Sequence, residues 1–317
     1  MDSQRRDFIR QSGLVGGGLL MWEPINQLST LSGNRLGLRQ FLDEVNIIHT
    51  NDLHNNIEPL QSGKKLGYGG LNNISTSLAQ AAPSFLLLDA GDFLDDKASI
   101  GEQKRMIRSM NQLGFQASTI GNRELSNGVE RLASLILMMK FSLVNCNYTF
   151  DHPVLQNNIH AYRVLRSGRF KIGITGVGTN QSIPTTGVTW QHPYDKANSL
   201  ARLLKDQKGC DLVICLSHLG YKHPSGPNNE EFAKASENID LIISGHSELI
   251  MPGKMILRNK LKHEVIVSHG GPGGILMRQI TFGFDQNQKK NHIASRNIVP
   301  GSALDSSGYT EINRIMA

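Results

Sequence analysis

Short apolar runs, each followed at once by polar side chains, recur along this 317-residue chain from residue 45 onward. Five of them have the composition of buried strands: 45–49 (VNIIH), 84–90 (SFLLLDA), 115–120 (FQASTI), 211–218 (DLVICLSH) and 240–246 (DLIISGH). Segments with apolar residues at helical spacing separate them, over residues 69–82, 97–113, 129–139 and 195–207. This alternation predicts an α/β fold built from layers of helix and sheet.

The polar residues that end these runs are of the types that bind metal ions. They are Asp52 and His54, Asp92, Asn122, His218 and His246, in chain order. Taken singly, such a residue is more often ordinary turn chemistry or a structural histidine. The carboxyl ends of strands in an α/β sheet meet at one edge, however, so five such loops in series favour a shared site over a purely structural domain.

This residue set suits two adjacent divalent cations, with Asp92 as the most plausible bridging carboxylate. Two cations about 3.5–4 Å apart can hold a bridging hydroxide and both ends of an in-line phosphoryl displacement. The mixture of nitrogen and oxygen ligands fits Mn, Zn or Fe better than Ca, which prefers oxygen ligands alone. His269, in SHGGPGG, is an open case near the expected edge of the site.

The charge and the cysteine content argue against nucleic acid as a partner and against a disulfide framework, respectively. The net charge is +6, but the basic residues are scattered and aromatic residues make up only 6% of the chain, which disfavours nucleic acid. A small anionic substrate explains the positive charge equally well. The three cysteines, Cys146, Cys210 and Cys215, form no CxxC pair, and their odd number argues against a disulfide framework.

The N-terminus contains Arg5 and Arg6 followed by DFIR, which resembles the twin-arginine export motif. The apolar stretch GLVGGGLLM that follows is too short to span a membrane as a mature helix, and no other segment is long and apolar enough. We therefore expect residues 1–44 to be an export leader and connector of a periplasmic protein. An ordinary amphipathic or disordered leader is the alternative.

Six motifs, in this order, resemble the 5′-nucleotidase branch of the calcineurin-like metallophosphoesterases: IIHTNDLHNNIEP, YGGLNNIS, LLLDAGDFLDD, TIGNRELSNG, CLSHLGY and LIISGHSE. The resemblance covers about residues 45–285, which we expect to be the catalytic domain, and leaves 286–317 as a short polar tail. It implies a four-layer αββα sandwich with a dinuclear metal centre that hydrolyses phosphate monoesters or nucleotides.

The resemblance also implies which residues bind each metal. Asp52 and His54 would bind one cation, Asp92 would bridge both, and Asn122, His218 and His246 would hold the second. Two residues after His246, where the family has a Gln or His ligand to the first metal, this chain has Glu248. A carboxylate can also coordinate at that position, and it adds a negative charge.

The loop TIGNRELSNG departs from the family pattern GN-H-E-F-D, because Arg123 replaces the His and Ser126 replaces the Asp. Arginine cannot donate a proton near neutral pH, but its planar fork can hold a phosphoryl oxygen. We therefore expect Asn122 and Arg123 to be the catalytic residues of a phosphoesterase with weakened activity on poor leaving groups. The alternative is a pseudoenzyme that binds metal or nucleotide and works with a partner chain.

A second departure concerns the substrate-binding domain that follows the catalytic domain in nucleotidases of this family. Residues 286–317 leave no room for it. We therefore expect either that substrate recognition is minimal or that a partner chain supplies the missing half.

Overall fold

The structure is a computed structural model that describes residues 43–61, 65–81, 84–181, 183, 186–222, 226–251 and 253–301. The expected leader and connector lies outside the described residues, apart from positions 43 and 44. Among the helices of the described part of the chain, none combines the length and apolar character needed to cross a membrane.

Seven strands form the first sheet: β1 (Glu44–Thr50), β2 (Leu86–Asp89), β3 (Ala117–Ser118), β4 (Ser142–Val144), β6 (Ile159–His160), β14 (Met277–Phe284) and β15 (Lys290–Ile298). Their spatial order is β15-β14-β1-β2-β3-β4-β6. The strands from β1 to β6 pair in parallel, whereas β14 and β15 are antiparallel to their neighbours.

Six strands form the second sheet: β7 (Tyr162–Ser167), β8 (Phe170–Gly178), β10 (Leu212–His218), β11 (Leu241–Ser244), β12 (Met255–Arg258) and β13 (Glu264–His269). Their order is β12-β13-β11-β10-β8-β7, with β8, β10, β11 and β13 parallel to one another. A separate antiparallel ribbon pairs β5 (Tyr148–Phe150) with β9 (Val188–Trp190).

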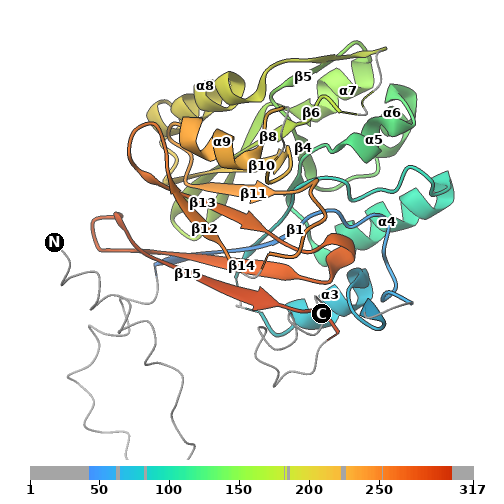
Figure 1. The fold of residues 1–317 in the computed structure, drawn as a ribbon, viewed down its shortest axis with the longest axis horizontal. Helices are drawn as coiled ribbons and strands as arrows, with labels where there is room; N and C mark the ends of the chain where they lie inside the picture. The colour runs from blue at the N-terminus through green and yellow to red at the C-terminus, as the bar shows by residue number, and fades with distance from the viewer. Residues whose placement is uncertain are drawn as a thin grey trace, which may run out of the picture. The chain divides into compact units, whose positions relative to one another are not determined.

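The helices cover the outer faces of the two sheets (Figure 1). They are α3 (Gly70–Leu78), α4 (Ile100–Leu113), α5 (Asn122–Ser126), α6 (Val129–Ile136), α7 (Pro153–Asn158), α8 (Pro193–Asp206) and α9 (Asn229–Ala235), with a 3₁₀ turn at η2 (Pro272–Gly274). One apolar cluster joins the first sheet to α3, α4 and α6, and another joins the second sheet to α8 and α9. A third cluster lies between the sheets. The predicted four-layer αββα sandwich is confirmed.

The alternation of side chains along a strand explains why the central runs are apolar throughout. In β2, Leu86 and Leu88 face the second sheet, whereas Leu87 faces the helices. The same holds in β1, where Ile47 points between the sheets and Ile48 points outward. A parallel strand buried on both faces therefore carries a continuous apolar run.

The segment after residue 285 differs from the expected polar tail. Strand β15 extends the first sheet and pairs with β14 over most of its length. As an edge strand it is mostly exposed, and its sequence KNHIASRNI is correspondingly polar, so it lacks the apolar pattern that reveals the central strands. The short strands β5, β9 and β12 were missed as well, because three or four residues give too little pattern to detect.

Candidate functional site

The predicted ligands come from five parallel strands, three in the first sheet and two in the second. Asp52, Asp92 and Asn122 follow β1, β2 and β3, while His218 ends β10 and His246 follows β11. The two sheets meet at this edge: the backbone N–H of His246 donates to the Asp52 carboxylate at 3.1 Å. All of these strands contribute their carboxyl ends, as the sequence pattern indicated.

Two groups of side chains have ligand atoms that all lie within 4.8 Å of one another. The first group is Asp52, His54 and Asp92, and the second is Asp92, His218 and His246. Asp92 belongs to both groups. Asp52, Asp92 and His218 are at most 3% exposed, so the shared carboxylate lies in a site with little access to bulk water.

The two remaining candidates lie beside these groups, one at each. The Oδ1 atom of Asn122 is 3.1 Å from Nδ1 of His246 in the second group. Glu248 is half exposed, and its Oε1 atom is 3.1 Å from Nε2 of His54 in the first group. The structure thus brings all seven predicted ligands together, and their coordination of a metal stays a prediction.

Close packing of the backbone makes this convergence possible. A Cβ atom on Gly121 would collide with the Asp92 carboxylate, so only glycine lets the β3 loop approach the shared ligand. Five of the seven candidates, Asp52, His54, Asp92, His246 and Glu248, have left-handed backbone with φ between 46° and 79°. Such conformations cost about 1–3 kcal/mol each and gather at functional sites, where the surrounding fold enforces them.

The imidazoles present unshared ring nitrogens to the carboxylates. The Nδ1 atom of His218 donates to the carbonyl of Ala90 at 2.7 Å, which leaves Nε2 as the free acceptor. Nε2 lies 3.2 Å from Asp92 and 3.9 Å from Asp52, and it forms no hydrogen bond within the described part of the chain. The buried Nε2 of His54, 3.1 Å from the Glu248 carboxylate, likewise forms no hydrogen bond among the described residues. Buried ring nitrogens that face carboxylates without a hydrogen bond fit a bound cation.

The electrostatics of the site also favour positive charge. Burial lowers the pKa of His218, but the adjacent Asp92 carboxylate outweighs burial and raises this pKa to about 10. Burial raises the pKa of Asp52, because little solvent reaches its charge. A divalent cation held among these groups would replace the proton that the carboxylates otherwise attract.

Glu124 supports the candidate site from behind, and the sequence analysis did not single it out. Its buried carboxylate accepts backbone N–H groups from Asp92 at 2.9 Å, Leu94 at 2.9 Å and Gly121 at 2.8 Å. Burial and the charge of Asp92 raise its pKa to about 8. Glu124 therefore ties the β2 loop to the β3 loop. The available signal was its position three residues after Gly121, where a capping glutamate reaches back to the start of a helix.

A second supporting layer lies behind Asp52. Asn51 donates to Oδ2 of Asp52 at 2.7 Å and accepts the backbone N–H of Gly270 at 2.7 Å. His269, left open by the sequence, is buried next to it, with Nε2 3.5 Å from Asn51 and Nδ1 3.0 Å from Ser244. Burial and the charge of Arg278 lower the pKa of His269 to about 3, so its ring is neutral and serves to position Asn51.

Arg123 finds carboxylate partners that the sequence did not predict. Its Nη1 atom is 3.0 Å from Asp96, its Nε atom is 3.6 Å from Asp92, and its Nη2 atom is 3.5 Å from Glu248. Ser126 instead donates to the carbonyl of Asn122 at 2.8 Å, within its own helix. Arg123 is thus oriented by the β2 loop and Glu248 and not by the residue at position 126.

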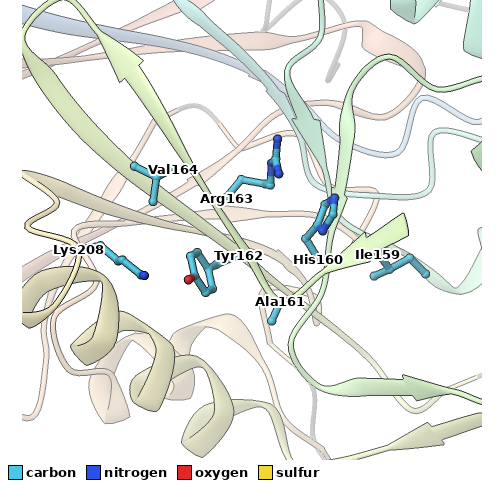
Figure 2. A pocket seen from close by; sticks show the side chains of 7 residues that line it. All are labelled: Ile159, His160, Ala161, Tyr162, Arg163, Val164 and Lys208. Carbon is cyan, nitrogen blue, oxygen red and sulfur yellow. The ribbon is translucent and has the colours of Figure 1, made fainter. Parts of the chain in front are cut away.

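Two pockets lined by described residues bear on the site. One, of about 570 Å³, is lined by Asn55, which follows the candidate ligand His54 in sequence, and by Asp95, which lies 3.7 Å from Arg123. The other, of about 620 Å³, lies at the adjoining edges of the sheets, where β6 leads into β7. Figure 2 shows that its basic side chains, His160, Arg163 and Lys208, do not converge on one point. Of these two, the first therefore has lining residues that neighbour the candidate site.

The fold and the paired Asp/His clusters define a metallophosphoesterase-type domain. The family model described as calcineurin-like phosphoesterase matches residues 45–247, and the chain belongs to this family. The family is metal-dependent, and the described residues include the Asp/His groups that could hold a metal ion. The predicted recognition of a 5′-nucleotidase-type metallophosphoesterase domain is confirmed.

Curated relatives agree with this assignment. The snake venom 5′-nucleotidase of Naja atra is 28% identical over 66% of this chain and 42% of its own length. The 5′-nucleotidase of Bos taurus is 27% identical over 66% of this chain and 38% of its own length. The chain therefore spans about two fifths of the length of these relatives. Their relationship supports a hydrolase.

Solved structures show the same fold. The 5′-nucleotidase precursor from Thermus thermophilus has a TM-score of 0.71 at 22% identity, covering 86% of this chain and 58% of that chain. The calcineurin-like phosphoesterase YfkN from Bacillus subtilis has a TM-score of 0.68 at 20% identity, covering 86% of this chain and 96% of that chain.

Proposed function

We propose that this chain is a phosphoesterase that binds two divalent metal ions and hydrolyses phosphate monoesters or nucleotides. The observation that carries the proposal is the position of Asp92, whose carboxylate belongs to both three-residue groups. A carboxylate shared in this way is suited to bridging two cations. The relatives that are 5′-nucleotidases support a nucleotide as the substrate.

The residues present fit the roles expected of such a centre. Asp52, His54 and Glu248 would hold the first cation, and Asn122, His218 and His246 the second, with Asp92 contributing to both. Divalent cations bound there supply Lewis acidity and activate water as a nucleophile. Mn, Zn or Fe suit the mixed imidazole, amide and carboxylate donors.

Arg123 would act on the phosphoryl group by charge alone. Its guanidinium is about a quarter exposed and lies beside the shared carboxylate, so an anion arriving at the cluster meets it. It can hold a phosphoryl oxygen and stabilise charge that develops in the transition state. It cannot protonate a leaving group, because the neighbouring carboxylates raise its pKa further above its ordinary value, against the opposing effect of burial.

One observation favours the pseudoenzyme as a second candidate. Among the described residues, Arg123 already contacts Asp92, Asp95, Asp96 and Glu248, so it must exchange carboxylates for phosphate to take part in turnover. A chain that binds metal or nucleotide and works through a partner needs no such exchange.

Metal content and turnover, measured on the same preparation, separate these candidates. We expect two metal ions per chain and hydrolysis of 4-nitrophenyl phosphate that increases with added Mn. Asp92→Asn should lose both metals and the activity, whereas Asp151→Asn, at an exposed position outside the site, should lose neither. Two metals without turnover would favour the pseudoenzyme, and fewer than two in the wild type would contradict a dinuclear centre.

Export and a partner chain stay separate predictions of the sequence. Fusion of residues 1–44 to a reporter that is active only outside the cytoplasm tests the twin-arginine leader, with Arg5→Lys/Arg6→Lys as the control. Size-exclusion chromatography of the native protein, followed by a nucleotidase assay of each fraction, tests the partner. Full activity in a monomeric fraction would count against it.

A further inference from the structure

The pocket of about 570 Å³ is linked to the candidate metal centre through two of its lining residues, Asn55 and Asp95. Asn55, which lines it, follows the candidate ligand His54 in sequence. On the opposite wall, Asp95 lies with its Oδ1 atom 3.7 Å from Nη1 of Arg123. A substrate with its phosphate at the metal centre can therefore extend its leaving group into this pocket.

Both walls of the pocket are held in place by hydrogen bonds. On one wall, the backbone carbonyls of Asn56 and Ile57 each accept an N–H from the first turn of α3 at 3.0 Å. On the other wall, Asp95 accepts the backbone N–H of Lys97 at 2.9 Å, and Ser99 and Glu102 cap the start of α4 reciprocally. The pocket is thus preformed, as small-molecule sites usually are.

The acidic side chains that line the pocket have hydrogen-bond partners, whereas its two basic side chains have none among the described residues. Glu58 accepts a hydrogen bond from Asn72 at 2.8 Å, and the other two acids are engaged by the loop contacts just described. Lys97 and Arg105 are exposed, and within the described ranges neither side chain forms an ion pair or hydrogen bond. The charge of Arg105 reaches Glu102, whose pKa is lowered first by hydrogen bonds from Ser99. Two cations therefore remain available to an anionic ligand.

The rest of the lining suits a flat organic group. Ile57, Pro59 and Leu60 contribute partly buried apolar surface, and Asn55 and Gln61 contribute amides. A ring can pack on the apolar side chains while a negatively charged substituent reaches the two cations.

We propose that this pocket is a specificity subsite for the leaving group of the substrate, and that it selects phosphate esters that carry a second anionic group beyond the scissile phosphate. Lys97 and Arg105 bind that second anion, and the loop from Ile57 to Leu60 packs against the part of the substrate that joins the two charges. This inference rests on the proposed function, because it places the scissile phosphate at the metal centre.

Binding of two phosphonates that cannot be hydrolysed tests the subsite without requiring turnover. Benzylphosphonate and 4-carboxybenzylphosphonate share the ring and the phosphoryl group, but only the second carries another anion. By calorimetry on the Mn-loaded chain at low salt, we expect the carboxylated compound to bind about three- to tenfold more tightly, the effect of two partly exposed ion pairs. The preference should shrink at high salt.

The variant Lys97→Gln/Arg105→Gln should bind the two phosphonates equally. Arg108→Gln, which removes an exposed arginine of α4 that does not line the pocket, should keep the preference. Equal binding by the wild type, a preference that survives in the double variant, or no binding of either compound would overturn the subsite. Phenyl phosphate hydrolysis is measured in parallel. A binding preference without hydrolysis would support the subsite and contradict the proposed enzyme. Hydrolysis without a binding preference would support the enzyme and contradict the subsite.

Discussion

Removal of the Glu124 side chain should loosen the candidate site and destabilise the fold together. The carboxylate of Glu124 is 2% exposed and accepts three backbone N–H groups, from Asp92, Leu94 and Gly121. In Glu124→Ala these donors lose their partner in a space that is too buried to supply water freely. We therefore expect a loss of stability well above that of an ordinary capping residue.

The magnitude follows from two opposing contributions. Three buried donors left unsatisfied cost about 2 kcal/mol each, or about 6 kcal/mol. The wild type, in turn, holds a carboxyl whose pKa burial and Asp92 raise to about 8, whereas the unfolded carboxyl is ionised at pH 7; this difference offsets about 3 kcal/mol at pH 7. The net expectation for Glu124→Ala is a loss of about 3 kcal/mol, a large part of the total stability of a typical domain.

Urea unfolding at pH 7 measures this loss, and the chain contains a matched control. Glu102 has the same capping role at the start of α4 but is exposed, so Glu102→Ala should cost only about 1 kcal/mol. Calorimetric titration with Mn should show at least tenfold weaker binding by Glu124→Ala and unchanged binding by Glu102→Ala. Equal losses of stability in the two variants would refute the role assigned to burial.

Three further outcomes follow from other contacts in the structure. Arg123→His/Ser126→Asp should speed hydrolysis of alkyl phosphates by up to about 10²-fold with little change on 4-nitrophenyl phosphate, because it restores a proton donor; equal gains on both substrates would contradict this. Gly121→Ala should weaken Mn binding at least tenfold by calorimetry, since its Cβ collides with Asp92. Burial raises the pKa of Asp240, but two contacting lysines lower it by more. At pH values above the unfolded-state pKa of about 3.9, the ionised carboxylate of Asp240 therefore stabilises the fold. This stabilisation is lost as the pH falls through the lower folded-state pKa. Asp240→Asn should cost about 1–3 kcal/mol at pH 7 in urea unfolding, and the difference should disappear at the acid end.

The sequence predicted the parts of the site that depend on strand order alone. Asp52 and Asp92 follow apolar runs that can only be buried parallel strands, so their convergence at one sheet edge needs no knowledge of side-chain detail. The same reasoning reached His218 and His246 in the second sheet. The alternation of strands and helices predicted an α/β layered fold, and the resemblance to the family implied its four-layer arrangement.

The contacts that were missed depend on tertiary structure and leave no local pattern. Nothing in the spacing of Asn51 and His269, 218 residues apart, shows that they lie behind the same ligand. Glu124 looks like an ordinary residue of a helical turn until its three N–H partners are seen. The edge strand β15 was missed because it is mostly polar and only Ile293 and Ile298 pack against the core, too few apolar residues to form a pattern.

The three departures from the family motifs form one connected change. Glu248 contacts both His54 and Arg123, and Asp96 supplies the closest carboxylate to Arg123, so an aspartate at position 126 has no partner to orient. A histidine placed alone at position 123 would sit among carboxylates that stabilise its charged form and would give up its proton reluctantly. The recovery expected for Arg123→His/Ser126→Asp should therefore be largest when Glu248→Gln is added, and a rate that does not rise on that addition would show that Glu248 acts only as a metal ligand.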